Sequence, residues 1–389
     1  MTYASLQKAE NASYWEYVGE GNQNLVVRYI GNDSIFKRKA LRILKCDESE
    51  IKIPTKHDIL FKQQFIERII RKLVGHEYIL LMQPVNTSSS FLSQLAQNIE
   101  HVRPISRRKK KIITTTCISF LMDDLTQLWP NSPSLTLELK PKWGFKPSSP
   151  FANEIKKKYC RFCMHSHLRG DLLKEYCPLD LYSGDPERIK KALTILFMNI
   201  PQTKTLRITF AHKINEQPSK VKDVYHLLSN DDGLIQEILE HILLEDPILR
   251  KLKRLQSTLD ELDIEGILPL YNQLDTSLET QDIEIWEDVL ANYEAEQNDL
   301  SVNNRKQKIY EYLLSMTFKD CSIMINIAPA AVANSHKSIK CRHLLFQYDL
   351  KVVDTDLKNI DKIPYWYTLD QSIVHNTLNT KFKKQECLS

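Results

Sequence analysis

The sequence predicts a mixed fold of helices and sheets (α/β, of the α+β kind) with two lobes, a smaller N-terminal sheet-plus-helix lobe and a larger mixed C-terminal lobe. Three observations predict it. The chain has 389 residues, more than one simple hydrophobic core usually holds. Patterns typical of short strands fill the first 122 residues. A polar stretch with Pro130 and Pro133 follows, and beyond residue 135 strand and helix patterns alternate.

Four segments of the N-terminal part are expected to form strands. "YWEYVGEGNQNLVVRYIG" (14–31) predicts a strand, a glycine turn and a second strand, because apolar and polar residues alternate in its second half. "KALRILKC" (39–46) predicts another strand. The apolar runs "EYILLMQP" (77–84) and "CISFLMDD" (117–124) are short enough to be buried strands.

Helical spacing appears in four segments. "DILFKQQFIERIIRKLVG" (58–75) has large apolar residues every four positions and Gly75 as a typical stop. "PERIKKALTILF" (186–197) begins with the proline that favours a first helical turn. "LIQEILEHILLED" (234–246) and "RKQKIYEYLLSM" (305–316) also predict helices.

The C-terminal part adds strands and a polar end. Leu137 and Leu139 alternate with polar residues, and "CSIMINIAP" (321–329) and "HLLFQYDLKVVD" (343–354) are apolar enough for strands. The last stretch, 374–389, is expected to be a polar tail. The predicted division is an N-terminal lobe at 1–122, a connection at 123–134 and a C-terminal lobe at 135–389.

Composition excludes several classes of protein. Hydrophobic residues make up 42% and charged residues 26%, as in ordinary globular proteins, and a net charge of +4 argues against a general nucleic-acid coat. No apolar signal segment and no run of 18 apolar residues is present, and eight scattered cysteines are not a disulfide framework. We therefore expect a protein of the cytoplasm and nucleus with neither membrane nor nucleic acid as a partner. A monomer is expected as well, although composition does not determine the oligomeric state.

The stretch "LELKPKWGFKPSSP" (137–150) concentrates positive charge at the end of a predicted strand. Lys140, Lys142 and Lys146 surround one carboxylate, Glu138, and Pro141 and Gly144 interrupt the strand. A solvated turn does not need so many cations, so a densely anionic ligand is favoured.

Two further patterns suit phosphate chemistry. "GEGNQN" (19–24) lies between predicted strands, where backbone N–H groups of a glycine turn can approach phosphates, although such hairpins are common. Arg42 follows about 20 residues later, and an exposed strand arginine is the alternative. Asp320 and Asp354 flank predicted strands, where acids serve as a base and a magnesium ligand or merely as caps.

Two basic or cysteine-containing segments have competing interpretations. In "CRFCMHSH" (160–167) the CxxC spacing suits zinc, but the two histidines follow the cysteines too closely for the usual zinc site. A role for His165 in a pocket that binds an anion is therefore favoured. "RPISRRKKK" (103–111) is a nuclear-import patch, a nucleic-acid patch or a solvated loop, unless Arg103 and Arg107 reach the same pocket as Lys140.

The motifs together resemble the inositol-pentakisphosphate 2-kinase family. The resemblance extends from about residue 14 to residue 374 and is carried by "YVGEGNQNLVVRY", "LRILK", "RPISR", "ELKPKWGF", "RFCMHSHLR", "YCPLDLYSG", "LDIEGILPLYN", "KDCSIM" and "VVDTDLK". It implies a two-lobed kinase-like fold with the nucleotide in the cleft. It also implies ATP-dependent phosphorylation of the 2-hydroxyl of inositol 1,3,4,5,6-pentakisphosphate to inositol hexakisphosphate (phytate). The alternatives are a non-catalytic inositol-phosphate or RNA-binding protein, or a kinase of a different polyphosphate.

The resemblance also implies a role for each matching residue. The residues expected to act in catalysis are Asp320 as base, Asp354 as metal-binding acid and Arg42 in place of the kinase lysine. Those expected to bind ATP are Gly19, Glu20, Gly21, Asn22, Asn24, Arg42, Met122, Asp124 and Glu138. Those expected to bind the inositol phosphate are Arg107, Lys140, Lys142, His165, Arg169, Arg207, Lys358, Lys362 and Tyr367. The implied cofactors are ATP and Mg²⁺, with Asp320 and Asp354 as the metal ligands.

Some positions depart from the family pattern. Lys204 and Thr205 stand where relatives carry an Asn pair, and Trp366 competes with Tyr367 for the matching aromatic position. Plant members of the family bind a structural zinc through a His/Cys segment of the second lobe. No counterpart is recognisable here, so the sequence predicts no zinc.

Overall fold

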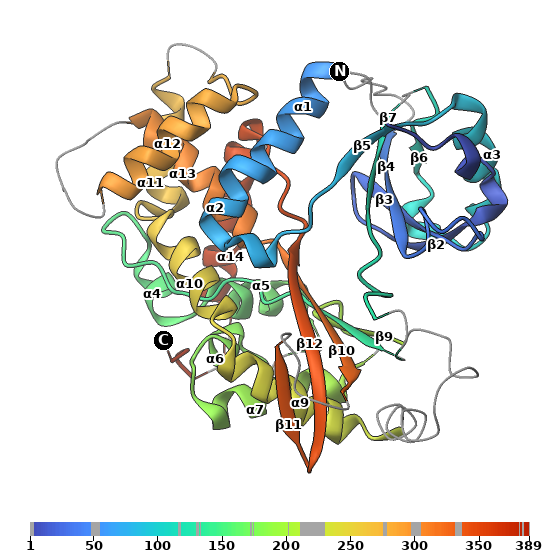
Figure 1. The fold of residues 1–389 in the computed structure, drawn as a ribbon. Helices are drawn as coiled ribbons and strands as arrows, with labels where there is room; N and C mark the ends of the chain where they lie inside the picture. The colour runs from blue at the N-terminus through green and yellow to red at the C-terminus, as the bar shows by residue number, and fades with distance from the viewer. Residues whose placement is uncertain are drawn as a thin grey trace. The chain divides into compact units, whose positions relative to one another are not determined.

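The computed structural model describes residues 4–47, 55–115, 118–129, 132, 134–171, 173, 175–200, 202–210, 230–274, 278–296, 305–330, 337–380, 382 and 385–388. Pro130 and Pro133, in the predicted connection, lie outside these residues. The chain folds into two compact units (Figure 1). The first unit comprises Met1–Gln64 and Leu80–Asn131, and the second comprises Phe65–Ile79 and Ser132–Ser389. The segment Phe65–Ile79 thus belongs to the second unit, although it falls within the predicted lobe 1–122.

The first unit is built on a seven-stranded sheet in the order β1-β5-β7-β4-β3-β2, with β6 paired to β4. The strands are β1 (Ala4–Ser5), β2 (Trp15–Glu20), β3 (Asn24–Tyr29), β4 (Lys39–Asp47), β5 (Gln83–Asn86), β6 (Lys110–Ile112) and β7 (Ile118–Asp123). Its helices are η1 (Gln7–Ala9), η2 (Ala12–Tyr14), α1 (Lys56–Gln64), α3 (Ser89–Ile99) and η5 (Ile105–Arg107).

The alternation of apolar and polar residues in the hairpin β2–β3 explains the core of the first unit. Leu25 and Val27 of β3 are fully buried and share a cluster with Trp15 of β2. Phe91 of α3 packs edge-on against Trp15, with 6.4 Å between the ring centroids. The Ser88 hydroxyl accepts a hydrogen bond from the Phe91 N–H and so caps the start of α3.

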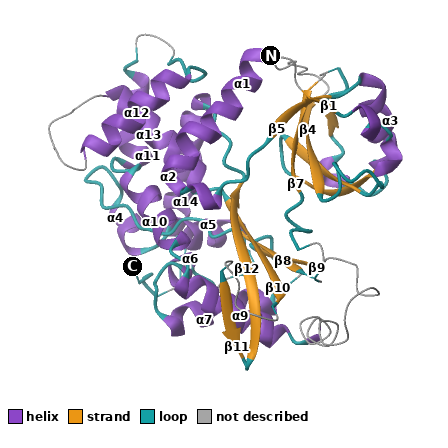
Figure 2. Ribbon diagram, in the orientation of Figure 1, coloured by secondary structure: helices purple, strands orange, loops and turns teal. Residues whose placement is uncertain are grey.

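The second unit contains a five-stranded antiparallel sheet in the order β11-β12-β10-β8-β9. The strands are β8 (Leu135–Leu139), β9 (Leu206–Phe210), β10 (Ser322–Pro329), β11 (Ser338–Cys341) and β12 (Leu344–Val353). Its helical elements are η3 (Phe65–Ile70), α2 (Arg71–Val74), η4 (His76–Tyr78), α4 (Glu154–Lys158), α5 (Arg161–Arg169), α6 (Pro178–Leu181), α7 (Pro186–Met198), α9 (Asp232–Glu245), α10 (Ile248–Thr258), α11 (Asp263–Asn272), α12 (Ile283–Glu296), α13 (Arg305–Phe318), η6 (Ile360–Lys362) and α14 (Ile363–Asn379). Figure 2 shows α9 beside β11, against which it packs.

Most of the predicted elements are confirmed, and the mixed fold with two mainly antiparallel sheets agrees with the predicted class. The hairpin β2–β3, the strands β4, β7, β10 and β12, and the helices α7, α9 and α13 form where periodicity placed them. The predicted helix 58–75 appears as α1, the π-helical turn η3 and α2, and it ends at Gly75 with φ of 116°. Among the described residues, no helix is both long and apolar enough to cross a membrane.

Two predictions are wrong. The run 77–84 is not one strand, because its first residues form η4 and pairing in β5 starts only at Gln83. Tyr78 is buried there for packing and for a 2.8 Å hydrogen bond from its hydroxyl to Asp246 Oδ1. The stretch from residue 374 is not all polar tail, because α14 continues to Asn379 with Val374 and Thr377 buried.

Candidate active site

One end of the five-stranded sheet collects charged residues from several strand ends. β10 begins at Ser322, opposite Val353, the last residue of β12, and its next residue lies opposite Leu139, the last residue of β8. Residues just before β10 and just after β8 and β12 therefore share one edge of the sheet. Together with two lysines from the adjoining loops they form what we call the sheet-edge cluster: Lys140, Lys142, Asp320, Asp354 and Lys358.

Lys140 lies at the centre of a polar network in this cluster. Its Nζ donates to Ser322 Oγ at 2.8 Å, and it is 3.2 Å from Glu138 Oε1 and 3.6 Å from Asp354 Oδ2. Burial by itself would lower the pKa of Lys140, but the carboxylates of Glu138, Asp354 and Asp320 raise it above its usual value. Lys140 is therefore cationic and held in place by oxygen atoms of β8, β10 and the turn after β12.

Asp320 is surrounded by ammonium groups. Lys358 Nζ donates to Asp320 Oδ2 at 2.7 Å, and Lys142 Nζ lies 3.8 Å from Oδ1. Burial acts to raise the pKa of Asp320, but Lys358, Lys142 and Lys140 outweigh it and lower the pKa below its ordinary value. The side chain is 62% exposed, so the ionised carboxylate is accessible to a ligand.

Two residues of the cluster have unusual backbone conformations. Lys142 and Asp354 both have φ of 61°, in the left-handed region that L-residues other than glycine rarely adopt. Such a conformation costs about 1–3 kcal/mol and is often found at functional sites. It turns the chain sharply directly after β8 and β12, where both side chains join the cluster.

The turn at Lys142 is held by a buried hydrogen-bond network. Gln256 Nε2 and the Tyr182 hydroxyl both donate to the Lys142 carbonyl, at 3.0 and 3.2 Å. The Gly144 N–H donates to Gln256 Oε1 at 2.7 Å. A Cβ at Gly144 would lie 2.7 Å from the Tyr182 ring, so only glycine fits beneath it. This network explains why a glycine follows two residues after Lys142.

The helix α5 brings two more of the predicted residues toward the cluster. His165 and Arg169 are four residues apart and so share a face of the helix. Burial, and then the positive charges of Arg169 and Arg161, lower the pKa of His165 to about 4, with a smaller contribution from Lys142. His165 is therefore a neutral hydrogen-bonding group near pH 7, while Arg169 is paired with Asp171.

Two further predicted residues of the second unit, Arg207 and Lys362, lie on a neighbouring strand and on a short helix. Arg207 of β9 pairs in register with Glu138 of β8, so it belongs to the same sheet edge. Lys362 follows Lys358 by four residues and is the last residue of η6.

The predicted aromatic contact lies on α14 instead. Tyr367 lines a groove of about 630 Å³ together with Leu168 of α5 and His375. Its rival Trp366 packs edge-on against the buried Tyr312, 6.2 Å between ring centroids. Of the two aromatic residues, Tyr367 is the one that faces an open groove.

In the first unit, buried charges fix the glycine turn. Glu20 accepts from Arg103 at 3.0 and 2.9 Å and is also hydrogen-bonded to Lys45, and all three side chains are at most 2% exposed. Lys45 Nζ also donates to the Gly21 carbonyl at 2.8 Å, and the Gly21 N–H donates to the Asn24 carbonyl at 2.9 Å. The Glu20 carboxylate therefore anchors the turn from within the unit.

The turn itself is exposed at Gly21 and Asn22. A Cβ at Gly21 would meet no atom within 4 Å, so local packing does not demand a glycine. A bare backbone at this position is available for close approach by a ligand. Arg103, in contrast, is 3% exposed, so its place in the predicted basic patch is structural.

The other first-unit predictions lie along neighbouring strands. Arg42 of β4 pairs with Phe120 of β7, and its Nη1 is 3.4 Å from the Met82 sulfur. Met122 of β7 pairs with Ala40 of β4. Arg42 and Met122 therefore lie on neighbouring strands of one sheet, two residues apart in register.

Asp124 and Arg107 are the remaining predicted residues of the first unit. Asp124 is buried, and its Oδ1 accepts from the Thr126 N–H at 2.9 Å and from the Thr126 hydroxyl at 2.6 Å. Its backbone N–H donates to the Arg38 carbonyl at 2.8 Å. Arg107 is exposed at the end of η5.

Comparison with known proteins identifies the family. A family model described as inositol-pentakisphosphate 2-kinase matches residues 17–372. The chain is 28% identical to the inositol-pentakisphosphate 2-kinase of Danio rerio, over 94% of this chain and 93% of that protein. It is 28% identical to the enzyme of that name from Oryza sativa subsp. indica and 26% identical to that of Arabidopsis thaliana, each covering at least 93% of both chains.

The chain belongs to the inositol-pentakisphosphate 2-kinase family. Family membership makes it a phosphotransferase and implies ATP as the phosphoryl donor. The roles of the individual residues stay predictions, to which the geometry adds their surroundings.

The structure adds residues of the candidate site that the sequence did not predict. Ser322 is fully buried and joins Lys140, through the bond already described, to Glu138 at 3.3 Å. It lies inside the quoted motif "KDCSIM", so a signal was present. Gln256 and Lys45 gave no such signal, because their partners are distant along the chain.

Proposed function

We propose that this protein transfers the γ-phosphoryl group of ATP to the 2-hydroxyl of inositol 1,3,4,5,6-pentakisphosphate, giving inositol hexakisphosphate. The observation that carries the proposal is the sheet-edge cluster in a chain of this family: three lysines and two carboxylates held at one end of one sheet. The cluster residues lie in the sequence motifs that match the family, and the fold adds that these separate motifs meet at one end of the sheet.

Substrate binding follows from the charge of the cluster. Five phosphate groups carry a total charge of about −10, which water solvates well. When water is removed, only a dense set of cations can replace that solvation. Lys140, Lys142 and Lys358 are each 24–28% exposed, so their ammonium groups can exchange carboxylate oxygens for phosphate oxygens. Arg169 and Arg207 would add planar groups that bind phosphate through two hydrogen bonds.

Asp320 is proposed to be the general base. Its lowered pKa keeps it ionised at neutral pH, as a proton acceptor must be. In the reaction the 2-hydroxyl oxygen forms a bond to the γ-phosphorus, and the bond from that phosphorus to the ADP oxygen breaks. The hydroxyl proton passes to Asp320, while Lys142 and Lys358 would hold neighbouring phosphates and keep the carboxylate oriented.

Asp354 and Asp320 offer the carboxylate oxygens that Mg²⁺ prefers, and both are more than half exposed. They therefore fit the ion, which when bound neutralises charge on the phosphates. The nucleotide is proposed to bind the glycine turn Gly19–Asn24 with Arg42, and Met122 with Asp124 on its adenine side, as in the two-lobed kinase arrangement with a nucleotide cleft.

Incubation of the full chain with ATP, Mg²⁺ and inositol 1,3,4,5,6-pentakisphosphate tests the proposal. We expect ADP and inositol hexakisphosphate in equal amounts, identified by phosphorus NMR, which reports which hydroxyl was modified. Inositol pentakisphosphate isomers with a different free hydroxyl serve as control substrates. Tight binding without turnover would instead establish a non-catalytic inositol-phosphate protein, and phosphorylation of another polyphosphate alone would establish a different kinase.

We further propose a monomeric protein of the cytoplasm and nucleus. For the location, the support is that the seven cysteines among the described residues form no disulfide, as suits a reducing compartment. Light scattering of the purified chain and imaging of a tagged chain in cells would test the two parts separately.

A further inference from the structure

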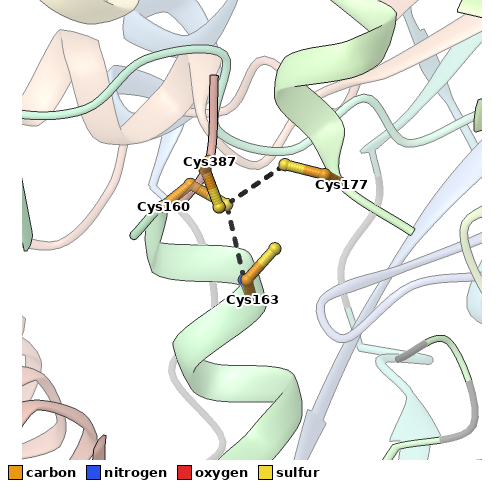
Figure 3. Close-up of side chains that lie close together, drawn as sticks. All are labelled: Cys160, Cys163, Cys177 and Cys387. Atoms are coloured by element: carbon orange, nitrogen blue, oxygen red, sulfur yellow. Dashed lines mark hydrogen bonds between the residues drawn. The ribbon is translucent and has the colours of Figure 1, made fainter. Parts of the chain in front are cut away.

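Four cysteines from three separate parts of the second unit converge on one point (Figure 3). They are Cys160 and Cys163 at the start of α5, Cys177 before α6, and Cys387 near the end of the chain. Their sulfur atoms all lie within 4.8 Å of one another, and the Cys160 and Cys177 sulfurs are 3.7 Å apart. None of the four residues is more than 5% exposed.

This arrangement has the dimensions of a tetrathiolate metal site. A zinc ion bound by four sulfurs at about 2.3 Å places neighbouring sulfurs about 3.8 Å apart, at the corners of a tetrahedron. The Cys160–Cys177 separation of 3.7 Å is close to this value and no separation exceeds 4.8 Å, so small side-chain rotations would complete the tetrahedron. Four protein ligands without an open position are typical of a structural site, and burial agrees with it.

The backbone around the first two cysteines suits bound thiolates. Cys160 is the N-cap of α5, and the Cys163 N–H donates to the Cys160 sulfur at 3.5 Å. Amide N–H groups of a first helical turn stabilise negative charge at that sulfur. The C-x-x-C spacing thus forms a turn that presents both sulfurs to the same point.

The fourth cysteine is fixed by contacts of its own. The Cys387 N–H donates to the Lys158 carbonyl at 3.1 Å, and Lys146 Nζ donates to the Cys387 carbonyl at 2.7 Å. Arg188 donates to the Leu388 carbonyl at 2.9 Å. The chain end is therefore docked so that the Cys387 sulfur completes the group (Figure 3).

A second group of potential ligands shows what an already satisfied site looks like. The carboxylates of Asp263, Glu265 and Asp370 also lie within 4.8 Å of one another. The ammonium group of buried Lys156 bonds to all three of them, and Arg161 donates to Asp370 at 2.8 Å. We call these five residues the Lys156 cluster. A lysine already supplies the positive charge there, so it offers no vacant place for a metal ion.

We propose that Cys160, Cys163, Cys177 and Cys387 bind one structural zinc ion. Binding would release the thiol protons to solvent and join three chain segments at one centre. The sequence predicted no zinc because only the C-x-x-C pair of the four ligands is recognisable in it. The other two ligands were sought in His165 and His167, which follow that pair too closely. The fold directs these histidines elsewhere: His167 Nε2 is 2.7 Å from Thr380 Oγ1, and His165 lies among arginines.

The proposed ion has a consequence for the active site. α5 carries His165 and Arg169, and the segment after Cys177 carries Tyr182, whose hydroxyl holds the Lys142 turn. A metal bound between these segments would fix both sides of the inositol-phosphate site relative to each other. Zinc removal should therefore lower thermal stability and weaken binding of the polyphosphate.

Metal analysis of the untagged full chain, purified from zinc-containing medium, tests the proposal. We expect about one zinc per chain by inductively coupled plasma mass spectrometry, and in the Co²⁺-substituted chain the visible absorption of a tetrahedral tetrathiolate. Zinc stripping by a strong chelator should lower the thermal midpoint, and zinc addition should restore it.

Variants identify the ligands. Cys387→Ser and Cys177→Ser should retain zinc about tenfold or more weakly against a competing chelator, whereas Cys341→Ser, a buried cysteine of β11, should not change zinc content. Cys387 lies near the end of the given sequence, so Cys387→Ser keeps the test valid if Cys177→Ser does not fold. A zinc-free chain unaffected by added zinc, iron in place of zinc, a Cys160–Cys177 disulfide, or unchanged zinc retention in both variants would each overturn the proposal.

Discussion

The sheet-edge cluster and the Lys156 cluster are built from the same chemical groups but differ in exposure. Lys156, Asp263 and Asp370 have side chains 2–3% exposed, whereas those of Asp320 and Asp354 are 62% and 55% exposed. Left-handed backbone occurs in both, at Asp263 and at Asp354, so strain alone does not mark a functional site. Exposure distinguishes the two clusters, because only exposed ion pairs can exchange their partners for a ligand.

The pKa shifts follow the same division. Burial raises the pKa of Asp370 even though Lys156 and Arg161 act to lower it. Asp320 has its pKa lowered instead, because three lysines outweigh burial. A buried ion pair is kept by its geometry, whereas a half-exposed one keeps its charges available for substrate.

The largest expected effect comes from Asp320→Asn. Loss of the proton acceptor should lower kcat about 10²- to 10⁴-fold, with the thermal midpoint nearly unchanged because the side chain is exposed. Steady-state kinetics and thermal unfolding measure the two. Asp361→Asn, the same change in the exposed turn η6, is the matched control and should keep full activity. Ordinary turnover by the Asp320 variant would refute its assignment as base.

Lys156→Met should have the largest effect on stability. It leaves the buried carboxylates of Asp263 and Asp370 and the partly buried Glu265 without their shared cation, which should lower the free energy of unfolding by about 3–5 kcal/mol. Urea unfolding gives the value. Lys157→Met breaks only the exposed pair with Glu154 and should cost at most about 1 kcal/mol. Equal losses in the two variants would show that burial does not decide how much an ion pair contributes to stability.

Lys142→Met should act mainly on substrate affinity. Removal of one charge-assisted hydrogen bond to a phosphate should weaken inositol pentakisphosphate binding about 10- to 100-fold, with Lys191→Met on exposed α7 as the control. Calorimetric titration at two salt concentrations measures both affinity and its salt dependence. Binding should weaken with salt in the unaltered chain and less steeply in Lys142→Met. A salt-independent affinity would contradict a cationic binding site.

The smallest effect is the pH dependence of stability from Asp320. Its folded-state pKa lies below the ordinary value near 3.9. The carboxylate therefore stabilises the fold above that pH, and this stabilisation is lost as pH falls through the folded value. The stability difference between the unaltered chain and Asp320→Asn should be constant from pH 7 to about 5 and shrink below about 4. Asp370, with a raised pKa, should respond in the opposite direction, and thermal midpoints of the two Asn variants across this range measure both.

Several parts of the site could be predicted because their signal is local. The hairpin β2–β3 and the strands β10 and β12 follow from alternation, and their ends bring Asp320 and Asp354 to one edge. The lysines of "LELKPK" indicate an anionic ligand by density alone. The apolar run 77–84 misled because burial of Tyr78 serves packing in the second unit, which a strand pattern cannot reveal.

The amino-acid sequence by itself determined the elements, the family and the cationic character of the substrate site, because periodicity and charge density are properties of short segments. Only the tertiary structure decided which charges are buried and which thiols meet. Glu20 contacts Lys45 and Arg103, and Cys387 lies next to Cys160. These partners are far apart along the chain, so no local pattern encodes the contacts. The physical reason is that side-chain partners are selected by packing of the whole unit, which excludes water from some charges and leaves it at others.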